Sequence, residues 1–145
     1  MKYSEYVQHD ALGLARLVAE RQVDAAHLLQ LARERLANVN PQLNAVVHRM
    51  DTIADARAKE SVDGAFAGVP FLIKDLFQDY AGVPSSYGNA ALKRADFAPQ
   101  EHAEITRRFM ASGVNIFAKT NTPEFGAKGV TEPEAFGITR NPWNT

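Results

Sequence analysis

Hydrophobic residues recur at helical spacing in the first forty positions of the chain. They predict one helix from Asp10 to about Arg21 and a second from Asp24 to Asn40. Each aspartate can cap the helix that follows it, and the second helix should end at Asn40 because the residue before Pro41 resists helical geometry. The short link predicts that the two helices pack as an antiparallel pair. Their apolar stripes consist of Leu14, Leu17 and Val18 in the first helix and of Leu28, Leu31, Ala32 and Leu36 in the second.

Two short apolar runs further along the chain, Val69–Ile73 and Val114–Ala118, have the length and composition of buried strands. Between them a helix is predicted over Glu101–Ser112, with Ile105 and Phe109 on its inward face. A strand, a connecting helix and a second strand make a parallel crossover unit. The pattern therefore predicts an α/β fold.

The remaining segments carry weaker patterns. Asp79–Pro99 is rich in turn residues, and a stretch of this length indicates a functional loop or short irregular elements. Asn44–Met50 reads as an extended piece and Thr52–Glu60 as a polar helix. A further helix is predicted to start at Thr122, with Pro123 in its first position.

Both predicted strands end in a lysine, Lys74 in the first and Lys119 in the second. Ligand sites of open α/β sheets lie beyond the carboxyl ends of parallel strands, so this edge is the first place to look for function. Burial would lower the pKa of Lys74 and allow it to act as a base. The pattern alone favours a simpler alternative, in which Lys74 reaches water or pairs with Asp75.

The polar residues after the second strand are candidates for substrate binding. Asn121 could hydrogen-bond an amide or hold a loop, and Thr120 lies beside it, whereas Thr122 has a capping function. The pair Ser85 and Ser86 lacks the glycines that frame a nucleophilic serine, and no Ser-x-x-Lys occurs in the chain. We interpret these two serines as loop residues.

Composition and charge narrow the classes of function. The 145 residues suit one domain, and a net charge of −1 gives no reason to expect a nucleic-acid or membrane partner. The chain has no cysteine, which excludes disulfides and a thiol nucleophile and fits a cytoplasmic protein. The four histidines have no metal-ligand spacing, so we expect no metal. The chain has no phosphate-binding loop and no Gly-x-Gly-x-x-Gly, so we expect no cofactor.

Three motifs in order resemble the amidase signature family. Gly68–Asp75 is similar to the family's lysine-bearing strand, and Gly113–Phe125 to its Gly-Lys-Thr-Asn segment, with Ala118 where glycine is usual. Phe136–Asn144 is similar to the approach to its glycine- and serine-rich signature. The predicted amino-terminal helices and the Val39–Ala45 element fit as well, so the resemblance covers essentially the whole chain.

The resemblance implies an α/β fold in which amino-terminal helices precede the first strands of a mixed sheet with flanking helices. On this interpretation residues 1–145 are the amino-terminal part of one truncated domain, with a helical region over about 1–60 and the start of the core over about 66–145. Family chemistry uses a Ser–cis-Ser–Lys triad, in which Lys74 would be the base. We expect Asn121 and Thr120 to bind substrate. Both serines would lie beyond Thr145, so we expect this piece to be inactive alone.

Several functions remain open within and beyond this resemblance. The segment Thr131–Gly137 is similar to the corresponding segment in the branch of the family that contains 6-aminohexanoate cyclic-dimer hydrolase. This resemblance implies a small-molecule amide as substrate. The alternatives are an amidotransferase A-type subunit that releases ammonia for tRNA-dependent amidation, and a degenerate module that binds without catalysis. The resemblance leaves a homodimer open for the full-length enzyme. Because the piece would lack most of the family's sheet, we expect it to expose strand edges and to be a marginally stable protein.

Overall fold

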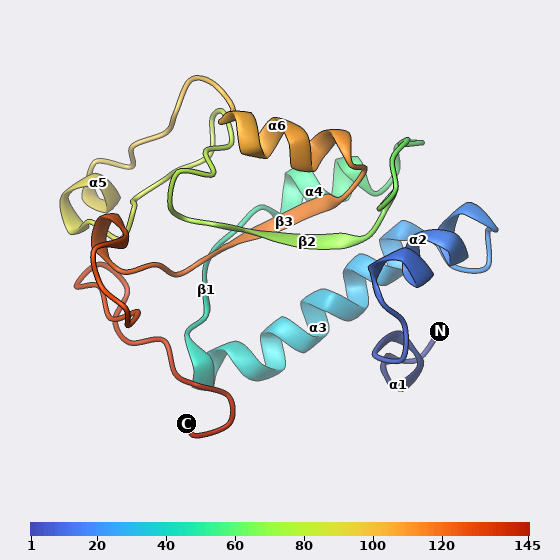
Figure 1. The fold of residues 1–145 in the computed structure, drawn as a ribbon, viewed down its shortest axis with the longest axis horizontal. Helices are drawn as coiled ribbons and strands as arrows, with labels where there is room; N and C mark the ends of the chain where they lie inside the picture. The colour runs from blue at the N-terminus through green and yellow to red at the C-terminus, as the bar shows by residue number, and fades with distance from the viewer.

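The computed structural model describes residues 1–145. Three strands form one small mixed sheet, and helices surround it (Figure 1). No helix is both long and apolar enough to cross a membrane. The helices are α1 (Tyr3–Tyr6), α2 (Ala11–Ala19), α3 (Ala25–Leu43), α4 (Asp51–Arg57), α5 (Ala90–Arg94) and α6 (Glu104–Ala111). The strands are β1 (Val46–Arg49), β2 (Pro70–Lys74) and β3 (Asn115–Thr120), and a single 3-10 turn covers Glu124–Gly126.

The sheet has the order β1-β3-β2, with β3 in the centre. β2 and β3 run parallel and are connected through α5 and α6, which confirms the predicted crossover unit. β1 pairs with β3 in the antiparallel direction, so the sheet is mixed, as the resemblance implied. The register places Ile73 opposite Lys119 and Lys74 opposite Thr120, so the two parallel strands end at the same edge.

Apolar clusters cover both faces of the central strand. On one face, Leu29 of α3 packs with Phe117 and Ala118. On the other, Ile73 and Ile116 pack together, and the rings of Phe71 and Phe109 of α6 lie 4.9 Å apart. Figure 1 shows α3 and α6 on opposite sides of the sheet. β3 is therefore buried along its length, which explains its continuous apolar run.

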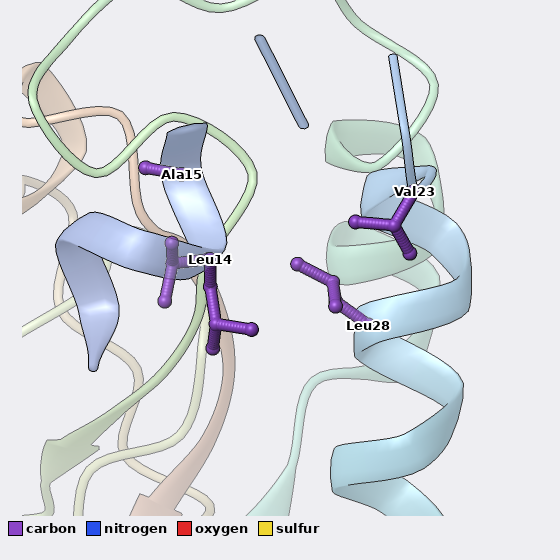
Figure 2. Packing of buried hydrophobic residues seen from close by; sticks show 5 residues of the cluster. Leu14, Ala15, Val23 and Leu28 are labelled. Atoms are coloured by element: carbon purple, nitrogen blue, oxygen red, sulfur yellow. The ribbon is translucent and has the colours of Figure 1, made fainter. Parts of the chain in front are cut away.

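The first two predicted helices, α2 and α3, share one buried apolar cluster. Figure 2 shows Leu14 of α2 opposite Leu28 of α3, and Ala15 and Val23 are buried in the same cluster. Asp10 caps α2 by accepting a hydrogen bond from the Gly13 amide at 2.7 Å, which confirms the predicted helix start.

The end of α3 differs from the prediction, because the helix continues through Pro41 to Leu43. The Asn40 side chain explains the late ending. Its Oδ1 accepts hydrogen bonds from the amides of Ala45 and Val46, both at 2.9 Å. The chain therefore turns after Asn44, which adopts a left-handed φ of 50°, and not at the proline.

Two predictions about helices near the sheet were wrong. α6 begins at Glu104, and its Ile105 is 41% exposed, whereas Thr106 is fully buried in its place. The helix predicted at Thr122 is only the three-residue 3-10 turn, because Phe125 adopts a left-handed φ of 49° that an α-helix cannot continue through.

Leu28→Ala should lower the free energy of unfolding by about 2–5 kcal/mol, because Leu28 is fully buried in the cluster that joins α2 and α3. Leu12→Ala removes the same atoms from a side chain that is 54% exposed and should cost less than about 0.5 kcal/mol. Urea denaturation of both variants measures the two values. Equal losses would contradict the packing seen in Figure 2.

Gly88→Ala tests how the loop over residues 79–99 packs on the chain after β3. A Cβ at Gly88 would lie 2.8 Å from the Thr122 carbonyl oxygen, and the φ of 71° is itself unfavourable for alanine. Gly82→Ala is the matched control, because its φ is 73° but nothing lies within 4 Å of the added Cβ. Both variants should lose roughly 1–2 kcal/mol for the backbone, and only Gly88→Ala should lose clearly more. Identical unfolding midpoints would show that the loop does not pack there.

Candidate functional site

The carboxyl edge of β2 and β3 brings the two predicted lysines together but turns them to opposite faces of the sheet. Residues in register share a face, and consecutive residues alternate between faces. Lys74 therefore shares one face with Thr120, and Lys119 shares the other with Ile73. The Asp75 amide donates to the Thr120 carbonyl at 3.0 Å and fastens the two strand ends to each other.

Lys119 is fully buried and bonded to the loop that crosses the edge. Its Nζ donates to the Pro84 carbonyl at 2.7 Å and to Ser85 Oγ, and lies 3.6 Å from an oxygen of Asp75. Burial lowers the pKa of Lys119, while the carboxylates of Asp75 and Asp79 raise it and so offset part of that effect. An ammonium group has three protons, and three acceptors surround this one. Lys119 is therefore committed to holding the loop.

Asp75 is the second half of this buried cluster. It is 3% exposed, accepts from Ser86 Oγ at 2.6 Å and from the Ser86 amide at 3.1 Å, and pairs with Lys119. Ser85 and Ser86 are loop residues, as predicted, but both are buried and both hydroxyls are engaged. The cluster of Asp75, Ser85, Ser86 and Lys119 thus joins β2, β3 and the loop over 79–99.

Lys74 is half-buried, and its side-chain nitrogen makes no hydrogen bond or ion pair within the chain. Its backbone amide donates to Gln78 Oε1 at 2.6 Å. The alternative in which Lys74 pairs with Asp75 is wrong, because that carboxylate is occupied by Lys119 and Ser86 on the other face. The Lys74 amine is left available to a group from outside these residues.

The two residues predicted to bind substrate differ in their surroundings. Thr120 is half-buried and lies in register with Lys74. Asn121 is buried, and its Nδ2 donates to Thr139 Oγ1 at 2.9 Å and to the Gly137 carbonyl at 3.2 Å. Asn121 therefore holds the segment around Gly137, which corresponds to the loop-holding alternative, and substrate binding by either residue stays a prediction.

A cavity of about 260 Å³ opens beside the buried cluster, and Lys74 does not line it. Asp75, Ser85 and Ser86 form part of its wall, together with His48 of β1. Burial, and then the positive charge of Lys119, lower the pKa of His48. The cavity therefore lies on the face of the sheet that carries Lys119.

No three His, Cys, Asp or Glu side chains lie together as metal ligands would.

The pairing of Asp75 with Lys119 was missed at the level of the sequence, although a signal for it existed. A lysine in a strand that is buried on both faces needs a partner, and an acid follows the neighbouring strand at the same edge. The same reasoning could not have found Ser85 and Ser86, because their position depends on how the loop folds back.

Comparison with known proteins places this geometry in a family. The family model described as Amidase matches residues 27–145. The 6-aminohexanoate-cyclic-dimer hydrolase of Paenarthrobacter ureafaciens is 38% identical over 135 residues, which make up 93% of this chain and 27% of that protein. The A-type subunit of glutamyl-tRNA(Gln) amidotransferase from Acidothermus cellulolyticus is 32% identical over 150 residues, covering 97% of this chain and 29% of that protein.

A solved structure agrees with the sequence relatives. The structure of 6-aminohexanoate cyclic dimer hydrolase matches with a TM-score of 0.88 and 37% identity, covering 94% of this chain and 28% of that one. This chain thus spans between a quarter and a third of the length of each of these three proteins. The fold implied by the three sequence motifs is confirmed, and the chain belongs to the amidase family.

Proposed function

We propose that the whole protein hydrolyses a carboxylic amide through an acyl-serine intermediate, with Lys74 as the proton acceptor. The observation that carries this proposal is the difference between the two strand-end lysines. Lys119 is surrounded by acceptors, whereas the Lys74 amine has no partner in the chain and lies at the carboxyl edge of a parallel strand pair. A base needs a nitrogen lone pair that is free to receive a proton, and Lys74 fits that need.

The proposed reaction follows the triad chemistry of the family. The neutral Lys74 amine accepts a proton from a bridging serine, which in turn accepts one from the nucleophilic serine. The nucleophilic oxygen bonds to the amide carbon, the C–N bond breaks, and the amine or ammonia leaves with a proton passed back through the same groups. Water then cleaves the acyl ester and releases the acid. Backbone amides of a glycine-rich loop would stabilise the oxyanion.

Residues 1–145 would supply only part of this machinery. They contain no Gly-Gly-Ser-Ser-Gly stretch, so both serines and the oxyanion loop would come from outside them. Thr120 would lie beside the substrate on the face of Lys74. Asn121 would support that edge by holding residues 137–139. Its side-chain NH₂ could contact substrate only by giving up its hydrogen bonds to Gly137 and Thr139.

The substrate we propose is a small amide, because the cyclic-dimer hydrolase matches 93% of the chain at 38% identity. An amidotransferase A-type subunit is the second candidate, because one such protein matches 97% of the chain at 32% identity. Copurification with partner subunits and release of ammonia from glutamine would favour the second. If the protein is a hydrolase of small amides, we propose that the full-length enzyme is a homodimer in the cytoplasm.

Lys74→Ala, made in the complete polypeptide that the gene encodes, should lower kcat for amide hydrolysis by about 10²- to 10⁴-fold, because the base is lost. Lys59→Ala, at an exposed lysine, is the matched control and should leave kcat unchanged. Steady-state assays on linear and cyclic amides, with circular dichroism to verify folding, measure the effect. Full activity of a folded Lys74→Ala variant would exclude Lys74 as the base, and absence of any turnover or ammonia release would favour the non-catalytic module.

The purified 145-residue chain should show no amide turnover above that of its own Lys74→Ala variant, because removal of the nucleophile and of the oxyanion hole leaves little catalysis. Release of amine from a panel of amides can be followed at high protein concentration. Turnover that depends on Lys74 in this chain would mean that a nucleophile lies within residues 1–145.

A further inference from the structure

We propose that the buried pair of Asp75 and Lys119 positions Lys74 for proton transfer, by holding the residue that follows it on the opposite face of the sheet. The inference rests on the proposed function of Lys74 and adds two positioning residues to it. Neither Asp75 nor Lys119 would touch the substrate.

Asp75 is the point at which three parts of the chain meet. Its amide donates to the Thr120 carbonyl of β3 at 3.0 Å. Its carboxylate accepts from Ser86 in the loop over 79–99 at 2.6 Å, and lies 3.6 Å from Lys119 Nζ. Lys119 in turn donates to the loop at the Pro84 carbonyl. The end of β2 is therefore fixed both to the neighbouring strand and to the loop.

This attachment sets the direction of the Lys74 side chain. Consecutive side chains of a strand point to opposite faces, so holding Asp75 under the loop directs Lys74 to the face that it shares with Thr120. The Lys74 amine lies about 6 Å from its Cα when the side chain is extended. A twist of about 10° at the strand end therefore moves the amine by about 1 Å, and an error of that size can cost about 100-fold in rate.

The burial of both groups makes the pair a strict constraint. A buried charge that loses its partner is strongly unfavourable, so the strand end cannot leave the loop while both residues are present. Burial lowers the pKa of Lys119 and the Asp75 and Asp79 carboxylates oppose that effect, as expected for a cation that depends on its partners. Such a pair is a poor source of stability, but it specifies one arrangement of the edge.

The experiment uses the complete polypeptide with three single variants and one double variant. Asp75→Asn and Lys119→Met each remove one charge, Ser86→Ala removes the 2.6 Å hydrogen bond without changing any charge, and Asp75→Asn/Lys119→Met removes both charges. Two readouts are taken at a temperature at which circular dichroism shows each variant folded. The first is kcat and KM for amide hydrolysis, and the second is the pH dependence of Lys74 acetylation by acetic anhydride, read by mass spectrometry.

Positioning predicts that Asp75→Asn and Lys119→Met both lower kcat by about 10- to 100-fold with KM within about twofold. Ser86→Ala should act in the same direction with a smaller effect. Relative to the wild type, the acetylation rate of Lys74 should either rise in all three single variants or fall in all three. A purely electrostatic influence would instead shift the acetylation midpoint in opposite directions in Asp75→Asn and Lys119→Met, because the lost charges have opposite signs. The double variant should regain stability relative to the singles but not kcat.

Leu28→Ala is the control for destabilisation, since it lies in the α2–α3 cluster away from the edge and should leave kcat and Lys74 acetylation unchanged. Folded Asp75→Asn and Ser86→Ala variants with wild-type kcat and wild-type Lys74 acetylation would overturn the proposal, as would full recovery of kcat in the double variant. If Lys74→Ala retains activity, the proposed function fails, yet the acetylation profiles still decide whether the pair positions Lys74.

Discussion

The structure depends on one buried ammonium group. Lys119 is fully buried at the end of the central strand, and the cost of removing its charge from water has to be offset by nearby acceptors. A carbonyl and a hydroxyl of the loop and the carboxylate of Asp75 supply them. The loop over residues 79–99 is long and turn-rich, yet its middle is buried against the sheet edge because it satisfies this one group.

The same interaction separates two lysines that look equivalent in the sequence. Both follow an apolar run, and both lie at the carboxyl edge of the parallel pair. Their register differs by one position, so they lie on opposite faces, and only one face is covered by the loop. One lysine thereby becomes part of the framework, and the other keeps its amine free. The edge in this way combines one face that the loop fixes with another on which an amine has no partner in the chain.

The sequence predicted what depends on local pattern. The helix capped by Asp10 and the parallel pair of β2 and β3 could be read from spacing and caps, since burial on one or both faces leaves a direct trace in the residues. Features that depend on distant contacts could not. The burial of Thr106 in place of Ile105 depends on how α6 packs on the sheet, and α3 passes Pro41 because the Asn40 side chain binds the turn beyond it. For the site, the position of Lys74 at the edge was predictable, whereas the partners of Lys119 required the register and the fold of the loop.

The hydrogen bond that the Lys74 backbone amide donates to Gln78 Oε1 has a consequence for the edge of the sheet. β3 has neighbours on both sides, but β2 has only one, so the outer side of β2 is an open edge. The Asp75 amide points to β3, and the Lys74 amide, one residue earlier, points away from it. Gln78 Oε1 occupies the position that the carbonyl of an added strand would take. Any strand that joins β2 on this side must displace the Gln78 side chain from the Lys74 backbone amide, so this one glutamine limits lateral growth of the sheet at the end of β2.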